Sequence, residues 1–227
     1  QRQMCIRDRV KGPTSIPLAG IWKAMEHSTS GWQSVCTCSE NRRPCTKPNT
    51  MPKDTVHIGL LSDTHGHWDD RITHHFSGCD EIWHAGDVGS LAVLDAMQQL
   101  GAHVRVVFGN IDDHRMRSET AEILHWELQG LRFCMTHIGG RPGRYAKGIR
   151  NLLNATRPDV FICGHSHLLK VQTDPSFGGL YMNPGAAGLN GFHKKRTLIK
   201  FSITGGQLEQ MHVVELGNRT KMARNQE

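Results

Sequence analysis

The 227-residue sequence lacks any apolar run of the roughly 18–20 residues that a membrane-spanning helix needs. It also lacks the composition of a disordered polyelectrolyte, because hydrophobic residues make up 37% of the chain and charged residues 21%. No apolar stretch of signal-peptide type follows Arg2, Arg7 and Arg9. We therefore expect a globular chain with no membrane association, long enough for one α/β domain with a buried core or for two small domains.

A basic surplus is missing from the body of the chain, although the formal net charge is +6. Residues 1–50 carry eight Lys or Arg and three Asp or Glu, for a net +5, and residues 218–227 carry three and one, for +2. The residues between them carry 16 and 17, for −1. The charge belongs to a leader and a basic tail, so nucleic acid is not an expected partner of the domain.

Clustered cysteine is missing after residue 50, where Cys79, Cys134 and Cys163 stand alone in apolar segments. Isolated buried thiols suit a reducing compartment, so we expect a cytoplasmic protein. In the leader, the cysteines at 36, 38 and 45 lack a fourth ligand at zinc-finger spacing, which argues against a metal knuckle.

Residues 1–50 show neither the period of a strand nor that of a helix. Residues 4–9, MCIRDR, resemble the conceptual translation of a transposase adapter used in sequencing libraries. We expect a leader of vector-like sequence and translated upstream DNA, with the natural start near Met51. A genuine disordered extension is the alternative.

From residue 55 onward, short apolar segments alternate with polar loops, and no internal repeat is visible. The pattern predicts helices over about 68–77, 91–100 and 145–156 and strands over 56–61, 81–85, 104–108, 122–128, 131–136, 159–163, 168–173, 180–182, 197–203 and 207–215. Ser90 is expected to cap the second helix, while Gln129-Gly130 and Gly205-Gly206 are expected to turn hairpins. One α/β domain over residues 54–217 is predicted.

Polar residues able to bind metal recur where these strands stop: Asp63, His65, Asp87, Asn110, His137, His165 and His167. The carboxyl ends of strands bring distant residues into one cleft. Three oxygen donors and four imidazoles exceed the four ligands of one tetrahedral ion, and they suit two ions that share a bridging carboxylate. Mixed nitrogen and oxygen ligands favour manganese, iron, zinc, cobalt or nickel over magnesium or calcium; manganese is our first choice.

The segments Asp63-Thr64-His65, Gly86-Asp87, Gly109-Asn110, Thr136-His137 and Gly164-His165-Ser166-His167 resemble, in order, the motifs of the calcineurin-like metallophosphoesterases. The similarity extends to their small prokaryotic YfcE-type phosphodiesterase subgroup and covers essentially all of residues 55–215. Each motif alone is weak, but five in order at strand ends form a specific signal. The resemblance implies a metallophosphoesterase-like sandwich of two mixed β-sheets flanked by helices.

The resemblance also implies roles for these residues. Asp63, His65 and His167 would hold the first metal, Asn110, His137 and His165 the second, and Asp87 both. A hydroxide activated by the two ions would then attack the phosphorus of a small or nucleotide-like phosphodiester.

One position departs from the family pattern. Many members carry a histidine after the Gly-Asn pair, where it helps the leaving group depart, but this chain has Ile111 there, followed by Asp112. Asn110 and Asp112 are the candidate catalytic residues. We expect Asp112 to orient a metal ligand or water rather than to act as the acid, and the source of leaving-group protonation stays open.

Three further residues are candidate substrate contacts: His67, Arg141 and Arg144. A solvated loop is the plainer interpretation for each. His84, two residues before Gly86, is expected to belong to the core, with support of the metal ligands as the alternative. Asn183-Pro184-Gly185-Ala186 resembles a family segment and is expected to shape a wall of the cleft.

These observations favour a metal-dependent phosphodiesterase. The alternative is a non-catalytic scaffold of the same fold that binds partner proteins, as a retromer subunit of similar fold does after losing key ligands. A nuclease that uses the basic ends is weaker. The physiological substrate, the native metal and the oligomeric state stay open, and a homo-oligomer is compatible with the sequence.

Overall fold

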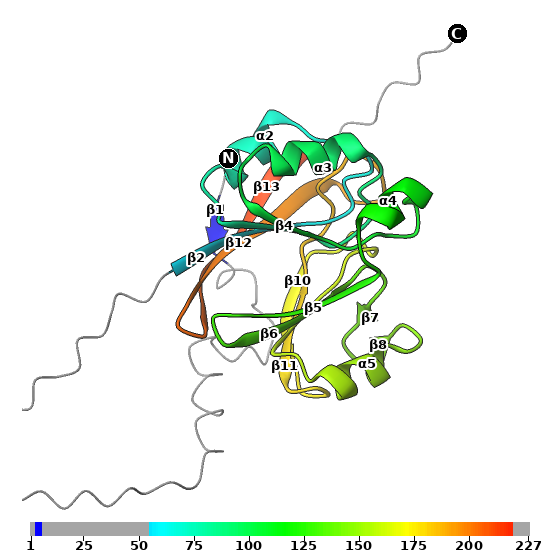
Figure 1. Ribbon diagram of the computed structural model, residues 1–227, viewed down its shortest axis with the longest axis vertical. Helices are drawn as coiled ribbons and strands as arrows, with labels where there is room; N and C mark the ends of the chain where they lie inside the picture. The colour runs from blue at the N-terminus through cyan, green and yellow to red at the C-terminus, as the bar shows by residue number, and fades with distance from the viewer. Residues whose placement is uncertain (1–2, 6–54, 220–227) are drawn as a thin grey trace, which may run out of the picture. The chain divides into compact units, whose positions relative to one another are not determined.

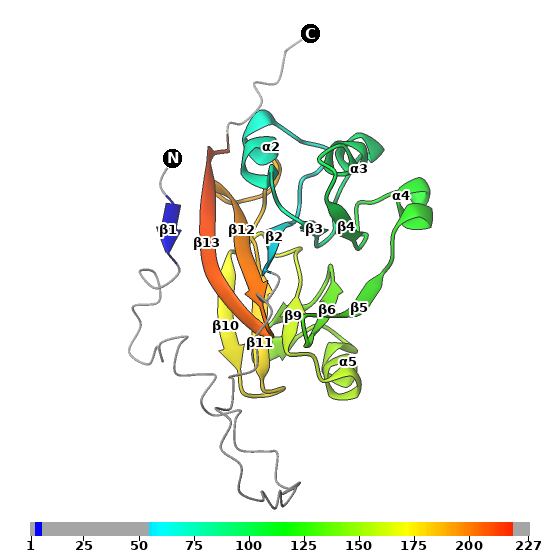
Figure 2. The ribbon, with the colours of Figure 1, turned by 60° about the vertical axis from the view of Figure 1, so that its left-hand side comes forward.

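The computed structural model describes residues 3–5 and 55–219. Two β-sheets face each other in this part of the chain, with helices on their outer sides (Figure 1, Figure 2). The leader expected over residues 1–50 lies outside the described residues except for Gln3–Cys5, which form strand β1. The tail expected over 218–227 lies outside them beyond residue 219, so both expectations stay predictions.

The first sheet combines parallel and antiparallel pairs. Its order is β1-β13-β12-β2-β3-β4, with bounds Gln207–Asn218 for β13, Lys195–Thr204 for β12, Thr55–Leu61 for β2, Glu81–His84 for β3 and His103–Val106 for β4. β2, β3 and β4 are parallel, so their carboxyl ends lie at one edge. The alternating β2-α2-β3-α3-β4 order requires this arrangement.

The second sheet has the order β10-β11-β9-β6-β5. The bounds are Lys170–Asp174 for β10, Gly179–Asn183 for β11, Val160–Ile162 for β9, Leu131–Thr136 for β6 and Ile123–Leu128 for β5. β6, β9 and β11 run parallel to one another, while β5 and β10 are antiparallel edge strands. The chain therefore has the mixed α/β sandwich that the family resemblance implies.

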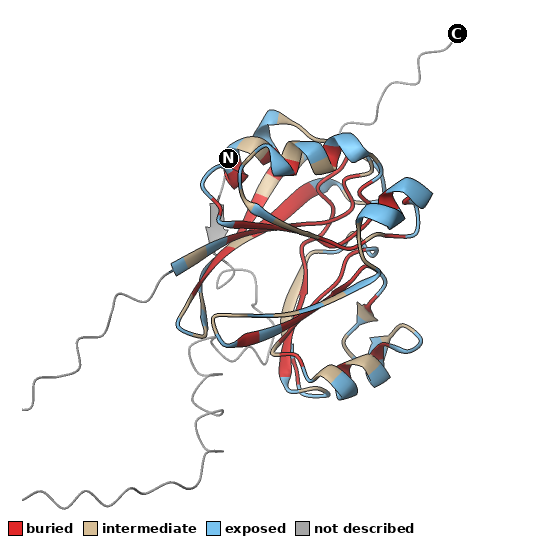
Figure 3. Cartoon of the chain, in the orientation of Figure 1, coloured by how far each residue is buried: buried red, intermediate tan, exposed pale blue. Residues whose placement is uncertain are grey.

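Helices cover each sheet through buried apolar side chains (Figure 3). On the first sheet lie α2 (Asp70–Phe76) and α3 (Leu91–Gln98), and on the second lies α5 (Ile149–Thr156). As predicted, Ser90 caps α3 by accepting a hydrogen bond from the Ala92 N–H, at 3.2 Å. None of the helices in the described part of the chain is both long and apolar enough to cross a membrane.

The helix predicted over 145–156 is shorter in the structure, where it is α5. It starts at Ile149, because Arg144–Tyr145 form strand β8 and pair with β7 (Gly140–Arg141). Gly148 has φ +86°, a left-handed conformation that no α-helix contains.

A second correction concerns the segment after Asp113, where the sequence pattern gave no helix. Helix α4 covers His114–Glu119, and the Asp113 side chain caps it by accepting a hydrogen bond from the Met116 N–H. The helix has one buried residue, Met116, so its sequence shows no apolar stripe. Both predicted hairpins are confirmed, with Leu128 opposite Leu131 and Thr204 opposite Gln207.

An aromatic cluster joins the two sheets. Trp83 of β3 is fully buried, and its ring centroid lies 4.9 Å from those of Trp126 and Phe133 on the second sheet. Its indole N–H donates to Glu81, at 2.7 Å, so the buried polar atom is satisfied. Edge-to-face packing of this kind stabilises the contact beyond the burial of apolar area.

Replacing Trp83 by alanine should lower the free energy of unfolding by about 3–5 kcal/mol, because the cavity would lie between the sheets. Urea denaturation measures this change. Phe192→Ala is the control, since the Phe192 ring is fully exposed and its loss should leave the midpoint in place. Equal midpoints for wild type and Trp83→Ala would contradict the assigned role of the cluster.

Candidate metal centre

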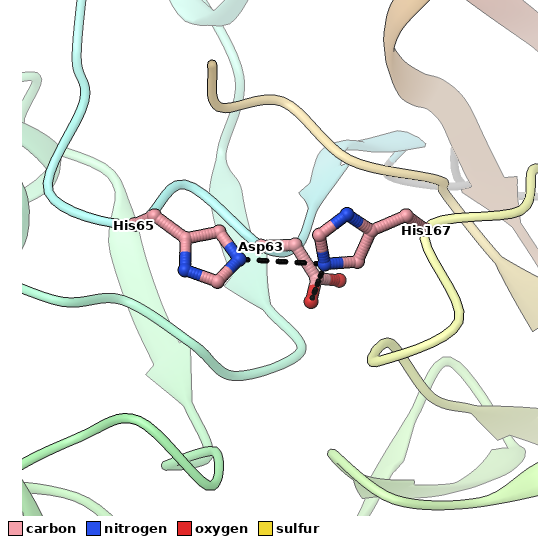
Figure 4. A group of neighbouring side chains, drawn as sticks. All are labelled: Asp63, His65 and His167. Carbon is pink, nitrogen blue, oxygen red and sulfur yellow. Dashed lines mark hydrogen bonds and ion pairs between the residues drawn. The ribbon is translucent and has the colours of Figure 1, made fainter. Parts of the chain in front are cut away.

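The first group of candidate ligands converges from the ends of β2 and β9 (Figure 4). The His167 Nε2 atom lies 3.1 Å from Asp63 Oδ1 and 3.3 Å from His65 Nε2. One ligand atom from each residue fits within 4.8 Å of the others. Asp63 Oδ1 is buried without a hydrogen-bond partner, while Asp63 Oδ2 accepts the His165 N–H at 3.1 Å.

The second group consists of Asp87, His137 and His165, with Asn110 beside it. His137 Nε2 lies 3.2 Å from Asp87 Oδ1 and 3.2 Å from Asn110 Oδ1. The His165 ring meets the His137 ring edge-on, with centroids 5.2 Å apart. Asn110 and His165 are exposed, so this group is open to solvent.

Asp87 belongs to both groups by position. Its Oδ1 atom faces His137, and its Oδ2 atom lies 3.9 Å from His65 Nε2. The carboxylate is almost fully buried, and the Ile111 N–H donates to Oδ1 at 3.1 Å. The structure thus brings all seven predicted ligands together, with Asp87 between the other two sets.

The backbone of the ligand loops is strained. Five candidate ligands have positive φ values: Asp63 at 55°, His65 at 50°, Asp87 at 55°, His165 at 64° and His167 at 55°. Non-glycine residues hold this conformation at a cost of about 1–3 kcal/mol each, and such residues concentrate at functional sites. Backbone hydrogen bonds hold two of the loops together. The Asp63 N–H donates to the Gly86 carbonyl at 2.9 Å, and the His65 N–H donates to the Asp87 carbonyl at 3.0 Å.

A hydrogen bond on the far side of the His137 ring fixes which of its nitrogens faces the other candidate ligands. His137 Nδ1 lies 2.8 Å from the Ala85 carbonyl oxygen, to which only a protonated nitrogen can donate. Nε2 is therefore the nitrogen that faces Asp87 and Asn110, and it would coordinate a metal ion after losing its own proton. Burial lowers the pKa of His137, but the hydrogen bond to Asp87, the charges of Asp63 and Asp87 and the hydrogen bond to Ala85 together outweigh burial and raise that pKa above the usual value. At His65, burial dominates and lowers the pKa.

His84 lies in the core, as predicted, and it also ties ligand loops together. Its Nδ1 atom accepts the Gly86 N–H at 3.2 Å, so Nε2 carries the proton and donates to Thr64 Oγ1 at 2.9 Å. Thr64 in turn donates to the Val88 carbonyl, at 3.0 Å. Burial lowers the pKa of His84 to about 4, which keeps the ring neutral.

The Asp112 carboxylate accepts hydrogen bonds from three backbone N–H groups. It accepts the N–H groups of Gly109 at 2.7 Å, Gly89 at 2.7 Å and Val88 at 3.2 Å. These bonds join the loop that carries Asp87 to the loop that carries Asn110. They support the positioning role expected for Asp112 rather than that of an acid.

Close approach explains the glycine before Asn110. A Cβ atom at Gly109 would collide with the Asp87 carboxylate. Asn183 is a further support: its side-chain N–H₂ donates to the Gly164 carbonyl at 2.8 Å and to Ser166 Oγ at 3.1 Å. The wall expected from Asn183 therefore begins with a contact to the loop of His165 and His167.

The predicted substrate contacts lie less centrally. His67 Nε2 sits 3.4 Å from the Asp69 carboxylate, and Arg141 and Arg144 are exposed partners across the β7–β8 hairpin. No hydrogen bond or ion pair within the described ranges joins these three side chains to the candidate ligands. Their roles stay predictions.

The donor set fits divalent metal ions. Carboxylate, amide and imidazole donors converge in two groups, the buried Asp63 Oδ1 atom has no hydrogen-bond partner, and the bond to Ala85 leaves Nε2 of His137 facing the other candidate ligands.

Residues 56–206 match the family described as the calcineurin-like phosphoesterase superfamily domain. A phosphodiesterase from Methanocaldococcus jannaschii is 26% identical over 125 residues, which are 48% of this chain and 72% of that protein.

Two solved structures share the fold. A novel archaeal phosphodiesterase superposes with a TM-score of 0.57 at 22% identity, over 71% of this chain and 100% of that one. Vps29 from Chaetomium thermophilum gives a TM-score of 0.57 at 12% identity, over 75% of this chain and 98% of that one. At these identities the two structures show the fold alone.

Asp112→Asn should weaken metal binding by about 10- to 100-fold, because an N–H₂ group would face backbone N–H groups and release the two ligand loops. Isothermal titration with Mn²⁺ measures the affinity. Asp113→Asn is the matched control, since this neighbouring side chain caps α4 and touches neither loop's ligands. Equal affinities for the two variants would rule out the assigned role of Asp112.

Proposed function

The chain belongs to the calcineurin-like phosphoesterase superfamily, and from that premise we propose that it is a metal-dependent phosphodiesterase with two divalent ions. The position of Asp87 between two ligand groups carries the proposal. Asp63, His65 and His167 would hold one ion, Asn110, His137 and His165 the other, and Asp87 both. The phosphodiesterase name of the relative from Methanocaldococcus jannaschii supports the diester preference.

The protein residues divide the work. Two ions, when bound, activate water and neutralise the charge of the phosphoryl group. Thr64, His84 and Asp112 hold the ligand loops in place. Asn110 and His165 are exposed, so their donors lie where substrate can reach them. Ile111 has no proton to give, and this favours esters whose leaving group departs without protonation.

Manganese is the metal that we propose first, with nickel, iron, zinc and cobalt as alternatives, because the donors are nitrogen and oxygen without thiolate. Cys79, Cys134 and Cys163 are free and buried. This thiol pattern supports the further proposal of a reducing, cytoplasmic location.

Chelation should remove hydrolysis of bis(4-nitrophenyl) phosphate, and Mn²⁺ should restore it. Asp87→Ala should lower kcat/KM by about 10³-fold, since it disturbs both ligand groups. Asp95→Ala, an exposed carboxylate on α3, is the control and should match wild type.

A different outcome would favour the non-catalytic scaffold, for which the likeness to Vps29 leaves room. That alternative predicts that the wild-type chain binds metal but hydrolyses no ester. It also predicts that the Asp87→Ala variant behaves like wild type. All seven ligand positions carry metal-binding residue types, which favours the enzyme.

Bis(4-nitrophenyl) phosphate should be hydrolysed at least about 10²-fold faster than dibenzyl phosphate, because no acid stands at Ile111 to protonate the benzyl alkoxide. Both esters carry two aromatic rings, so the comparison isolates the leaving group. Ile111→His should narrow the gap by supplying a proton donor. Comparable rates of wild type on both esters would refute this prediction.

A further inference from the structure

The most exposed large hydrophobic side chains of the described residues are found beside the candidate metal centre. Phe192 is 101% exposed, Leu168 62%, Ile111 46% and Ile138 44%. We call these four residues the apolar rim. Other exposed large hydrophobic side chains in the described ranges reach no more than 38%.

Three rim residues directly follow a candidate metal ligand along the chain: Ile111 after Asn110, Ile138 after His137 and Leu168 after His167. They come from three separate strand ends, those of β4, β6 and β9. The backbone of Ile111 is fixed at the centre itself, since its N–H donates to Asp87 Oδ1 at 3.1 Å.

Phe192 lies between two residues that contact the candidate ligand His167. Gly191 packs so closely on His167 that a Cβ atom there would collide with the imidazole ring. The His193 ring lies 5.4 Å from the His167 ring, centroid to centroid. Phe192 is therefore held between two residues that contact the same ligand, while its own ring stays in water.

The rim and the centre differ in chemistry. The centre presents carboxylate, amide and imidazole donors, which suit a charged phosphoryl group and its metals. The rim side chains have no hydrogen-bonding group, so they gain only by removing apolar surface from water. Each rim residue follows a candidate ligand or lies beside residues that contact one, so exposed apolar surface surrounds a polar site, an arrangement typical of binding surfaces. A phosphodiester combines both features, because its anionic phosphoryl group stands between two ester groups.

We propose that the apolar rim binds the ester group that the substrate retains, opposite the leaving group, and that the preferred substrates are phosphodiesters in which this retained group is apolar and aromatic. This inference rests on the proposed phosphodiesterase function. It makes Phe192 and Leu168, the most exposed rim residues, determinants of specificity rather than of the chemical step. The ring of Phe192 can stack on an aromatic ester without rearrangement of the core.

Two esters with the same leaving group test the rim. Bis(4-nitrophenyl) phosphate and methyl 4-nitrophenyl phosphate both release 4-nitrophenolate and differ in the other ester group. The double variant Leu168→Ala/Phe192→Ala should raise KM for the diaryl ester about tenfold. Its kcat for both esters and its KM for the methyl ester should stay at wild-type values. Comparing variant with wild type cancels the different intrinsic reactivities of the two esters.

Leu208→Ala is the matched control. Leu208 is partly exposed and lies opposite Ile203, which pairs with Val56 near the start of β2. It is therefore at the end of the sheet remote from the centre, which follows the carboxyl end of β2. This variant should keep the KM values of wild type for both esters.

Binding of phosphinates provides a readout that needs no turnover. Diphenylphosphinate and dimethylphosphinate share the anionic head group, and neither contains an ester bond. Calorimetry on the Mn²⁺-loaded protein should show diphenylphosphinate binding about tenfold tighter, a preference that the double variant loses.

The outcomes separate the two claims. Absence of metal-dependent hydrolysis of both esters would overturn the proposed function, and the phosphinate comparison would still decide on the rim. The proposed role of the rim alone would be overturned if the double variant changed KM equally for both esters while hydrolysis persisted. Equal affinities of wild type for the two phosphinates would overturn it as well.

Discussion

The shared position of the Asp87 carboxylate is the constraint on which the whole centre depends. One oxygen faces His137 and the other faces His65. A single carboxylate can serve two ions only if both ligand groups are held within a few ångströms of it. The fold achieves this because parallel strands of both sheets end on the same side of the sandwich. Residues about a hundred positions apart therefore meet, as His65 and His167 do with their Nε2 atoms 3.3 Å apart.

Holding the ligands there costs conformational free energy. Asp63, His65, Asp87, His165 and His167 all have left-handed backbone conformations, which the surrounding structure must stabilise. Part of that support is local, from Asp112 bonded to three N–H groups and from His84 between two loops. The rest comes from the rigid sheets, which the aromatic cluster around Trp83 joins. The hydrogen bonds of Asp112 and His84 and the packing around Trp83 together hold the strained loops in fixed positions relative to one another.

The sequence predicts most strands and the seven candidate ligands that the fold brings together, because an apolar run that stops at a polar motif marks a strand end directly. Other features depend on tertiary contacts. In the sequence, Asp112 and Asp113 are two adjacent acidic residues. Only the folded loops show that Asp113 caps a helix while Asp112 accepts hydrogen bonds from backbone N–H groups. Helix α4 is too short and polar to show a period. The left-handed Gly148 marks the true start of α5, and the exposure of Ile138 and Leu168 is invisible in a pattern that treats apolar residues as core.

The central claim is that two ions share Asp87, and the number of metal ions bound per chain tests it most directly. Equilibrium dialysis against Mn²⁺ followed by elemental analysis should find two ions in wild type. Asp63→Ala should keep one, while Asp87→Ala should lose tight binding of both. A wild-type chain that saturates at one ion, or an Asp87→Ala variant that still holds two, would contradict the account.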